Sequence, residues 1–236
     1  MALMPDLFEL DVYNFPNRDL NTLRNAKVIA VCGDGMSSLC EGKLEEIYTH
    51  IDSGKSITTI LISDGMDFWK SSISLSIAGG NSVESTIRKI VASCTNPAKI
   101  VSYIAQDMRL IRGQVFHGRA ADYVSTLAKS VGARAFMVRN GISIVRRGAY
   151  SMSVNLSEDD MPDGVSEANG AFIVRLRDIV AYPVGQMAII ENRRAQYRII
   201  CQSFECDTQQ GAWTTSLILV DEEHMLETDG NEWGGG

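Results

Sequence analysis

The stretch QVFHGRAADYVSTLAKSVGARAFMVRNGISIVR, from Gln114 to Arg146, contains a complete strand, helix and hairpin pattern. After a short apolar run, apolar residues recur at helical spacing: Ala120, Val124, Leu127, Ala128 and Val131. Gly132 follows, where a helix C-terminus favours a residue that adopts positive φ. The apolar runs Ala135–Val138 and Ile142–Val145 flank Arg139-Asn140-Gly141, and Asn-Gly between such runs is a strong hairpin signal. The stretch predicts a compact αβ unit.

The composition is that of an ordinary globular protein. Hydrophobic residues make up 45% of the 236 residues and charged residues 22%, and a chain of this length can bury a substantial core. Acidic residues outnumber basic ones by 29 to 22, which gives a formal net charge of −7. A dedicated nucleic-acid binder needs a basic face for phosphate contacts, so the charge argues against that class.

The cysteines and histidines predict neither a disulfide framework nor a metal site. The five cysteines show no CxxC spacing, and their odd number favours reduced, buried thiols. The three histidines, His50, His117 and His224, are far apart and show no ligand spacing. No apolar run reaches the ~18 residues that a membrane span needs. We therefore expect no metal, no cofactor and no membrane contact.

The first part of the chain predicts strands and contains one ambiguous segment. Leu7–Tyr13 alternates apolar and polar residues, as in a strand with one buried face. Lys27–Cys32 is an apolar run that ends at Gly33-Asp34-Gly35, a turn rather than a complete phosphate-binding motif. In Lys43–Ile51 the apolar residues have helical spacing, but a turn and the β-branched run Ser56–Ser63 follow. Periodicity favours a helix there, and the turn with its β-branched partner favours a hairpin.

One strand and two helices are predicted next. In Ser72–Ile77 serines alternate with apolar residues, the pattern of a half-buried strand whose serines face solvent or another subunit. Asn81 has capping-box spacing to an acidic residue three positions later, which predicts that a helix begins there. Asn96-Pro97 predicts the start of another helix that directs Ile100 and Ile104 inward.

The last third predicts a loop followed by strands. Asn155–Asn169 is polar and acidic, and a solvated loop is favoured over a calcium loop because the carboxylate spacing of an EF-hand is missing. Several segments rich in strand-forming residues follow at short spacing and predict a small antiparallel sheet or barrel. These segments are Phe172–Leu176, Gln186–Glu191, Tyr197–Phe204 and Trp213–Val220, with Thr208–Gly211 as a connection.

No catalytic motif is present. The sequence lacks a Gly-x-Ser-x-Gly elbow, an HExxH motif and a cysteine–histidine signature. Its carboxylates come in adjacent pairs such as Glu45-Glu46 and Asp159-Asp160, which point to different faces of a helix or strand. Glycoside hydrolysis needs two carboxyl groups that face one substrate, so it is not indicated. We assign no catalytic residue.

Three groups of motifs follow one another along the chain. Ile62–Asp67 contains an Asp-Gly step and precedes the serine-alternating strand and the helix after it. Val115–Ala128 is closed by Asn140-Gly141-Ile142, and Tyr197-Arg198-Ile199 is followed by Gly211–Thr215. In this order, from Lys27 to Val220, the motifs resemble the baseplate hub proteins of contractile-tailed bacteriophages.

The resemblance implies an α+β fold in which two antiparallel, tail-tube-like β-barrel or β-sandwich domains flank a small α/β insertion. It implies a first domain over residues 1–80, the insertion over 81–150 and a second barrel-like domain over 151–236. It also favours the hairpin over the helix at Lys43–Ile62.

The function implied is that of a structural virion protein without enzymatic activity, made in the bacterial cytoplasm and located in the tail baseplate. Three copies would form a ring of pseudo-sixfold symmetry that binds the tail tube protein, the spike protein and other baseplate proteins, and lets DNA pass without specific binding. The contact residues that we expect are Arg139, Arg146, Arg147, Trp213 and Trp233.

Two other classes of protein remain open at this point. One is a small peptidoglycan- or carbohydrate-cleaving enzyme that acts through an acid such as Glu45, Glu46 or Asp163. The other is a monomeric binding module.

Overall fold

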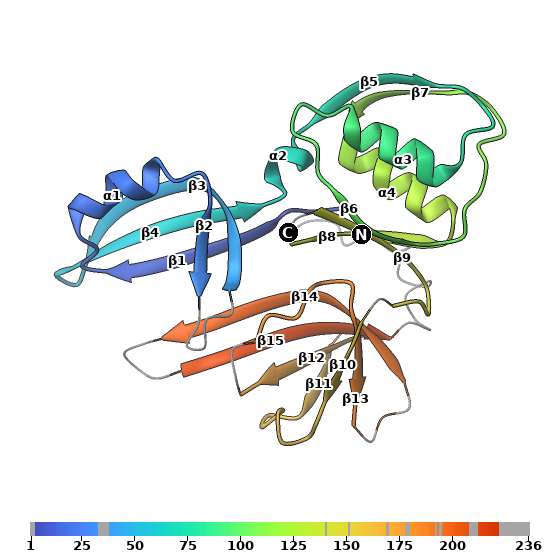
Figure 1. The fold of residues 1–236 in the computed structure, drawn as a ribbon. Coiled ribbons are helices and arrows are strands. Elements are labelled where there is room, and N and C mark those ends of the chain that lie inside the picture. Colours follow the sequence, from blue (N-terminus) through green and yellow to red (C-terminus); the bar gives the residue numbers. More distant parts are fainter. Residues whose placement is uncertain are drawn as a thin grey trace.

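The fold consists of two β-sheet units and a central unit that carries the two longest helices (Figure 1). The structure, a computed structural model, describes residues 3–32, 38–139, 141–150, 152–168, 170–177, 180–191, 193, 195–207 and 212–221. Strands dominate these ranges, so the α+β class is confirmed. The two outer sheets are curled half-barrels, so the barrel-like or sandwich-like domains that the resemblance implied are confirmed in this coarser form.

The first sheet has four strands in the order β1-β4-β3-β2. They are β1 (Asp6–Tyr13), β2 (Ile29–Cys32), β3 (Ser38–Asp52) and β4 (Lys55–Asp64). β3 and β4 form the predicted hairpin, with Ser53 and Gly54 at positive φ in its turn. The predicted strand near the N-terminus is confirmed as β1.

A β-bulge explains why the β3 sequence has helical spacing. The pairing of β3 with β4 shifts by one residue directly after Leu44. Leu44 therefore pairs with Ile62 and Ile47 pairs with Ile60, so two apolar side chains three positions apart point to the same face. The helix that periodicity favoured is wrong, and the hairpin is confirmed.

A short helix that the sequence analysis did not anticipate lies against one face of the first sheet. It is α1 (Asn17–Arg24), and its Leu23 packs on the cluster around Ile60 and Ile62. None of its residues is fully buried. Two polar turns give almost no periodic apolar signal, because such a helix depends on the sheet beneath it for its stability.

The central unit places two helices between two small sheets (Figure 1). α3 (Val83–Ala92) and α4 (Ala120–Ser130) contact each other and lie in the largest core. One sheet pairs β5 (Ser72–Ile77) with β7 (Gln114–Arg119). The other has the order β6-β9-β8, with β6 (Ile100–Ile104), β8 (Ala133–Val138) and β9 (Gly141–Arg146). A single turn, α2 (Met66–Trp69), leads from β4 into this unit.

The stretch from Gln114 to Arg146 folds as predicted. It forms β7, α4 and the β8–β9 hairpin, and Gly132 after the helix has a φ of 67°. Asn140 of the predicted turn lies outside the described residues. The strand predicted at Ser72–Ile77 is also confirmed, with Ile73 and Ile77 buried, Leu75 half-buried and the three serines exposed.

The start of α3 differs from the prediction. Ser82, and not Asn81, is the N-cap, and its hydroxyl oxygen accepts a hydrogen bond from the Ser85 N–H at 3.1 Å. Asn81 donates its side-chain amide to the Ala78 carbonyl at 2.8 Å. Asn and Ser are both residue types that favour the N-cap position, so the sequence alone does not show which of these two neighbours caps the helix.

The helix predicted after Asn96-Pro97 is wrong, because Ile100–Ile104 is the strand β6. β6 pairs in parallel with β9, and the Ile142 N–H donates to the Lys99 carbonyl at 2.7 Å. A Cβ at Gly141 would lie 2.2 Å from that carbonyl oxygen, so this close approach requires glycine. Pairing with β9, a strand distant in sequence, therefore decides the structure of this segment, and not the local helix-start signal of Asn96-Pro97.

The second sheet has six strands in the order β10-β13-β14-β15-β12-β11. They are β10 (Ser153–Leu156), β11 (Val165–Ala168), β12 (Ala171–Leu176), β13 (Met187–Ile190), β14 (Gln196–Asp207) and β15 (Ala212–Asp221). All four strands predicted in the last third are present, and each of the described pairings is antiparallel except that of β10 with β13. The loop predicted at Asn155–Asn169 is wrong over β11, which pairs with β12.

Some predictions are not decided by the described residues. β5, assigned to the first domain, is hydrogen-bonded to β7 of the central unit, while the three-domain division itself stays a prediction. The turns predicted at residues 33–35 and 208–211 lie outside the described ranges. Cys40 and Cys94 are buried, and Cys201 is exposed. Among the described helices, none is both long and apolar enough to cross a membrane.

Candidate subunit interface

The apolar face of the first sheet is only partly covered. Three of its described apolar residues are buried, Cys40, Ile60 and Ile62. Eight further apolar side chains around them are only half-buried: Phe8, Leu10, Val12, Leu23, Ile29, Val31, Leu44 and Ile47. α1 is too short to shield a face of this size, so the free subunit leaves apolar surface in contact with water.

The opposite face of the first sheet is acidic and aromatic. Alternation along β1 places Leu7, Glu9, Asp11 and Tyr13 there, all exposed. Through the register with β4, the same face receives Glu46, Tyr48 and His50 from β3, also exposed. No described helix lies on this face (Figure 1). In addition, β1 and β2 have no described neighbouring strand on their outer sides.

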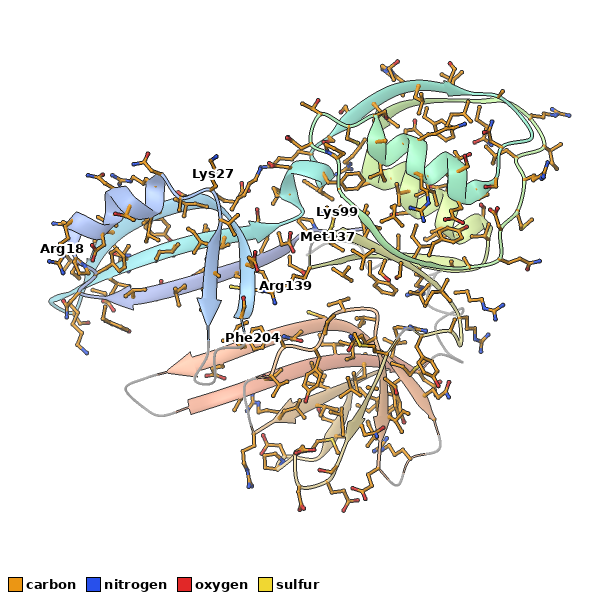
Figure 2. The ribbon with its side chains drawn as sticks, in the orientation of Figure 1. Arg18, Lys27, Lys99, Met137, Arg139 and Phe204 are labelled. Atoms are coloured by element: carbon orange, nitrogen blue, oxygen red, sulfur yellow. The ribbon has the colours of Figure 1, made fainter. Side chains whose placement is uncertain are left out.

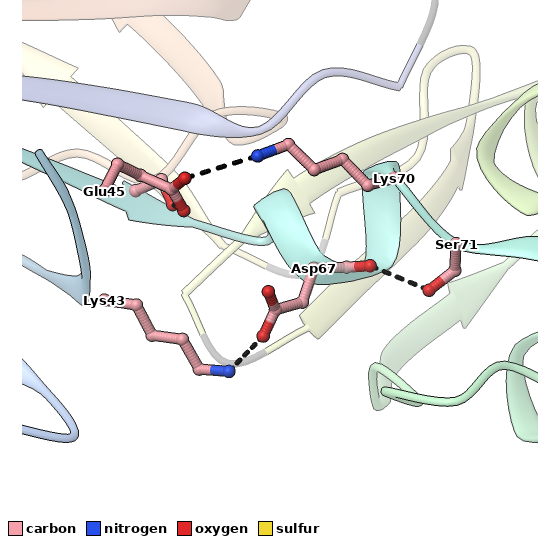
Figure 3. A network of polar contacts seen from close by, with 6 residues as sticks. Lys43, Glu45, Asp67, Lys70 and Ser71 are labelled. Atoms are coloured by element: carbon pink, nitrogen blue, oxygen red, sulfur yellow. Dashed lines mark hydrogen bonds and ion pairs between the residues drawn. The ribbon is translucent and has the colours of Figure 1, made fainter.

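A polar network ties the first sheet to α2 (Figure 3). Glu45 of β3 accepts hydrogen bonds from the Ser63 hydroxyl at 2.6 Å and from the Lys70 ammonium at 3.3 Å. Lys43 forms an ion pair with Asp67, whose carbonyl accepts a hydrogen bond from the Ser71 hydroxyl at 2.7 Å. The network connects α2 and the residue after it to β3 of the sheet. Each exposed ion pair in it adds little to stability by itself.

Arg139 reaches from the central unit to the first sheet. It lies between β8 and β9, and its guanidinium pairs with the Glu41 carboxylate of β3 at 2.5 Å (Figure 2). Beside this pair is a shallow pocket of about 170 Å³ that Lys43, Asp64 and Asp67 also line. Cations and carboxylates alternate around it and are paired with each other, so the pocket stabilises the junction of the two units rather than offering free charge to a ligand.

The predicted contact residues do not form one patch. Arg139 is next to the first sheet, whereas Arg146 and Arg147 are exposed at the other end of β9. The side chain of Trp213, in β15, and the whole of Trp233 lie outside the described residues.

The acids of the enzyme alternative are also separated. Glu45 belongs to the network at α2, Glu46 is exposed on β3, and Asp163 lies in the turn before β11 of the second sheet, 3.8 Å from Arg175. The described residues therefore bring no two of these carboxylates to one substrate position.

The three parts of the chain differ strongly in formal charge, a difference that the net charge of the whole chain does not show. Residues 81–150 contain eleven Lys and Arg and three Asp and Glu, a formal charge of +8. Residues 1–80 carry −5, from six basic and eleven acidic residues, and residues 151–236 carry −10, from five and fifteen. Counting charge for each predicted domain, instead of for the whole chain, would have found this segregation.

Two solved structures are similar to the chain over almost its whole length. No protein-family model matches the sequence, and no curated protein does. A solved tail protein from Neisseria meningitidis MC58 is similar at a TM-score of 0.64 and 11% identity, over 95% of this chain and 91% of that one. The 43 kDa tail protein of prophage MuSo2 from Shewanella oneidensis is similar at 0.68 and 10%, over 95% and 92%. The chain shares the fold of these two proteins.

Proposed function

We propose that the chain is a structural subunit of a bacteriophage tail, located in the virion, and more specifically a baseplate hub protein. Three copies form a ring that joins the tail tube to the central spike and lets DNA pass. The proposal assigns it no enzymatic activity.

The observation that carries the proposal is the fold shared with the two tail proteins over nearly the whole length of both chains. An identity of 10 to 11% supports a common architecture and not a common set of contacts, so the partners are inferred from the surface.

The first sheet supports an assembled state. Its half-buried apolar side chains and its edge strands β1 and β2, which have no described neighbouring strand, are surfaces that soluble monomers normally cover. A neighbouring subunit that packed against α1 would cover the apolar face, and one that continued the sheet would cover an edge. Because β1 and β2 are different edges, pairing of β1 in one copy with β2 in the next would be a head-to-tail contact, the type that closes into a ring.

The exposed acidic face of the first sheet supports the passage of DNA. Glu9, Asp11 and Glu46 lie on it, so a ring that turned this face inward would have a negative lumen. Such a lumen repels the phosphate backbone and prevents specific binding, so that DNA slides through.

Mass measurement of the purified protein, alone and with a candidate tube protein, tests the proposal. We expect concentration-dependent trimers and a complex with the tube protein. A chain that stays monomeric at every concentration and never enters particles would contradict the hub role.

The predicted contact residues provide a second test. Reversing the charge of Arg146 and Arg147 is expected to weaken incorporation into particles without unfolding the subunit, because both are exposed. Adding Arg139→Glu also breaks its pair with Glu41, so the double and the triple variants separate a partner contact from an internal one. Trp213→Ala and Trp233→Ala test the two aromatic contacts. Unchanged incorporation of all variants would remove these residues from the interface.

A further inference from the structure

The loop between β6 and β7, residues 105–113, is held firmly against the start of α3; we call it the arginine loop. The Val83 N–H donates to the Met108 carbonyl at 2.7 Å, and the Leu110 N–H donates to the Asn81 carbonyl at 2.9 Å. The Gly80 N–H donates in turn to the Leu110 carbonyl at 2.8 Å, and the Leu110 side chain is buried. The loop is therefore a rigid part of the central unit rather than a free connection.

This rigid loop presents an apolar surface with cations beside it. Ile111 is 96% exposed, Val115 at the start of β7 is 73% exposed and Met108 is 50% exposed. Arg109 and Arg112 flank Ile111, both are exposed, and neither forms an ion pair with any residue that the structure describes. A large aliphatic side chain fixed in water next to unpaired guanidinium groups is typical of a protein interface and not of a solvated turn.

The loop also contains one acid, which is engaged elsewhere. Asp107 accepts a hydrogen bond from the Glu84 N–H at 3.3 Å, at the N-terminus of α3. The negative charge of Asp107 therefore interacts favourably with the N-terminus of α3. The remaining charges of the loop are those of its two arginines.

A complementary surface is present on the second sheet unit. The acidic turn, residues 157–164, is anchored by the buried Met161 and by the carboxylate of Asp160, which accepts hydrogen bonds from the Ser157 N–H at 3.1 Å and the Ser157 hydroxyl at 2.6 Å. Asp159 and Asp163 are exposed on it, and Asp163 also lies 3.8 Å from the Arg175 guanidinium. Because these contacts already hold the turn in place, docking against it costs little additional conformational entropy.

We infer that the arginine loop of one copy docks against the acidic turn of the next copy, a contact that rests on the proposed ring. The charges favour this occupant, because the central part carries +8 and the C-terminal part −10 in the same chain. The two surfaces belong to different units and lie far apart in Figure 1, the loop beside α3 and the turn between β10 and β11. The contact is therefore head-to-tail, the type that closes into rings. The exposed apolar side chains favour a protein surface over nucleic-acid phosphates.

Charge reversal on the loop is the first arm of the test. Arg109→Glu with Arg112→Glu is expected to weaken self-association roughly tenfold or more in sedimentation analysis, with the effect greatest at low salt. Ile111→Ser is expected to weaken it by a similar factor at any salt concentration. The matched control is Lys99→Glu with Lys129→Glu, which changes the net charge equally on the exposed surface of the same central unit, outside the arginine loop, and is expected to have no effect.

Charge exchange is the second arm. Asp159→Lys with Asp163→Lys is expected to weaken self-association, and the combination of all four loop and turn substitutions is expected to restore it, because each copy then presents the opposite sign at both surfaces. Restored self-association identifies the arginine loop and the acidic turn as partners. If the combined variant associates no better than the loop variant or the turn variant alone, the inference is overturned.

The outcomes separate this inference from the hub role. If the wild-type protein forms rings and the loop variants form them equally well, the contact is wrong and the hub role stands. If the variants assemble normally but lose binding to a short DNA duplex, the loop binds nucleic acid and the inference is overturned. If the wild-type protein neither self-associates nor enters particles, the hub role fails as well.

Discussion

The two outer sheets are both curled, yet they are stabilised in different ways. Within the described residues, the hydrophobic cluster of the second sheet unit contains ten buried residues, among them Leu217 and Leu219, whereas that of the first sheet contains three. Around those three, the apolar side chains of the first sheet are half-buried, and its only covering element among the described residues is the two-turn α1. The second sheet wraps around its own core with six strands.

The difference teaches which unit folds by itself and which depends on neighbours. Hydrophobic stabilisation scales with the apolar area removed from water, and the second sheet removes most of it within one chain. The first sheet leaves more of its apolar side chains half-buried, and we expect a neighbouring surface to cover them. Four predictions test this contrast, in order of decreasing effect.

The largest effect is expected from Leu217→Ala in the second core. Leu217 is fully buried, so its truncation should lower the free energy of unfolding by about 3 kcal/mol. Leu10→Ala, at a half-buried position of the first sheet, should cost about 1 kcal/mol in the free subunit. Urea denaturation at low protein concentration measures both. Equal costs would show that the first sheet already has a complete core of its own.

Arg198→Met tests a polar anchor of the second sheet. Arg198 is 2% exposed and donates hydrogen bonds to the Gly185 carbonyl at 2.7 Å and the Ala149 carbonyl at 2.9 Å, the latter at the end of the central unit. Leaving these acceptors unsatisfied should lower the free energy of unfolding by about 2 kcal/mol. The neighbouring, exposed Arg193→Met is the control and should cost little in the same thermal unfolding measurement.

Gly42→Ala tests the packing of the first sheet at its tightest point. A Cβ at Gly42 would lie 2.2 Å from the Ser63 carbonyl oxygen, so β3 and β4 must move apart, at a cost of about 2 kcal/mol. Gly54→Ala, in the hairpin turn, meets no atom within 4 Å and is strained only through its φ of 78°, which costs about 1 kcal/mol. Amide exchange of β3 and β4 distinguishes the two. If Gly54→Ala costs more, close packing is not the constraint.

The smallest effect concerns Asp6, at the end of β1. Burial, and next the Asp64 carboxylate opposite it, raise the pKa of Asp6 from 3.8 to about 6. The folded state therefore binds its proton more tightly than the unfolded chain, so stability falls as the pH rises from about 4 to about 6. Asp6→Asn should be more stable than the wild type at pH 7 by about 1 kcal/mol and show no gain at pH 4. A constant difference across this range would contradict the assignment.

Local sequence signals predicted much of the secondary structure. The β7–α4–hairpin stretch, the serine-alternating β5 and four strands of the second sheet followed from periodicity and turn residues. Each of these elements has a regular apolar pattern because one face packs on a continuous core. At the β3 bulge the broken pattern predicted a helix where the chain forms a strand. In α1 the apolar pattern is absent, so no helix was predicted there.

The candidate interface was predictable only in part. The resemblance implied a tail protein, and the shared fold supports that proposal, but the contact residues Arg139, Arg146 and Arg147 lie at separate places that no local pattern specifies. The exposure of Ile111 depends on the hydrogen bonds that hold the arginine loop outward, and these join residues distant in sequence.

The sequence by itself determined where this chain forms helices and strands with one apolar face, and it contains the segregation of charge among its three parts. Only the tertiary structure decided that β6 is a strand beside Gly141, that both sheets remain open, and that the first sheet is incompletely covered. The physical reason is that periodicity reports which face of an element is apolar. Which surface covers that face, and how much of it stays in water, depends on partners that the local sequence does not encode.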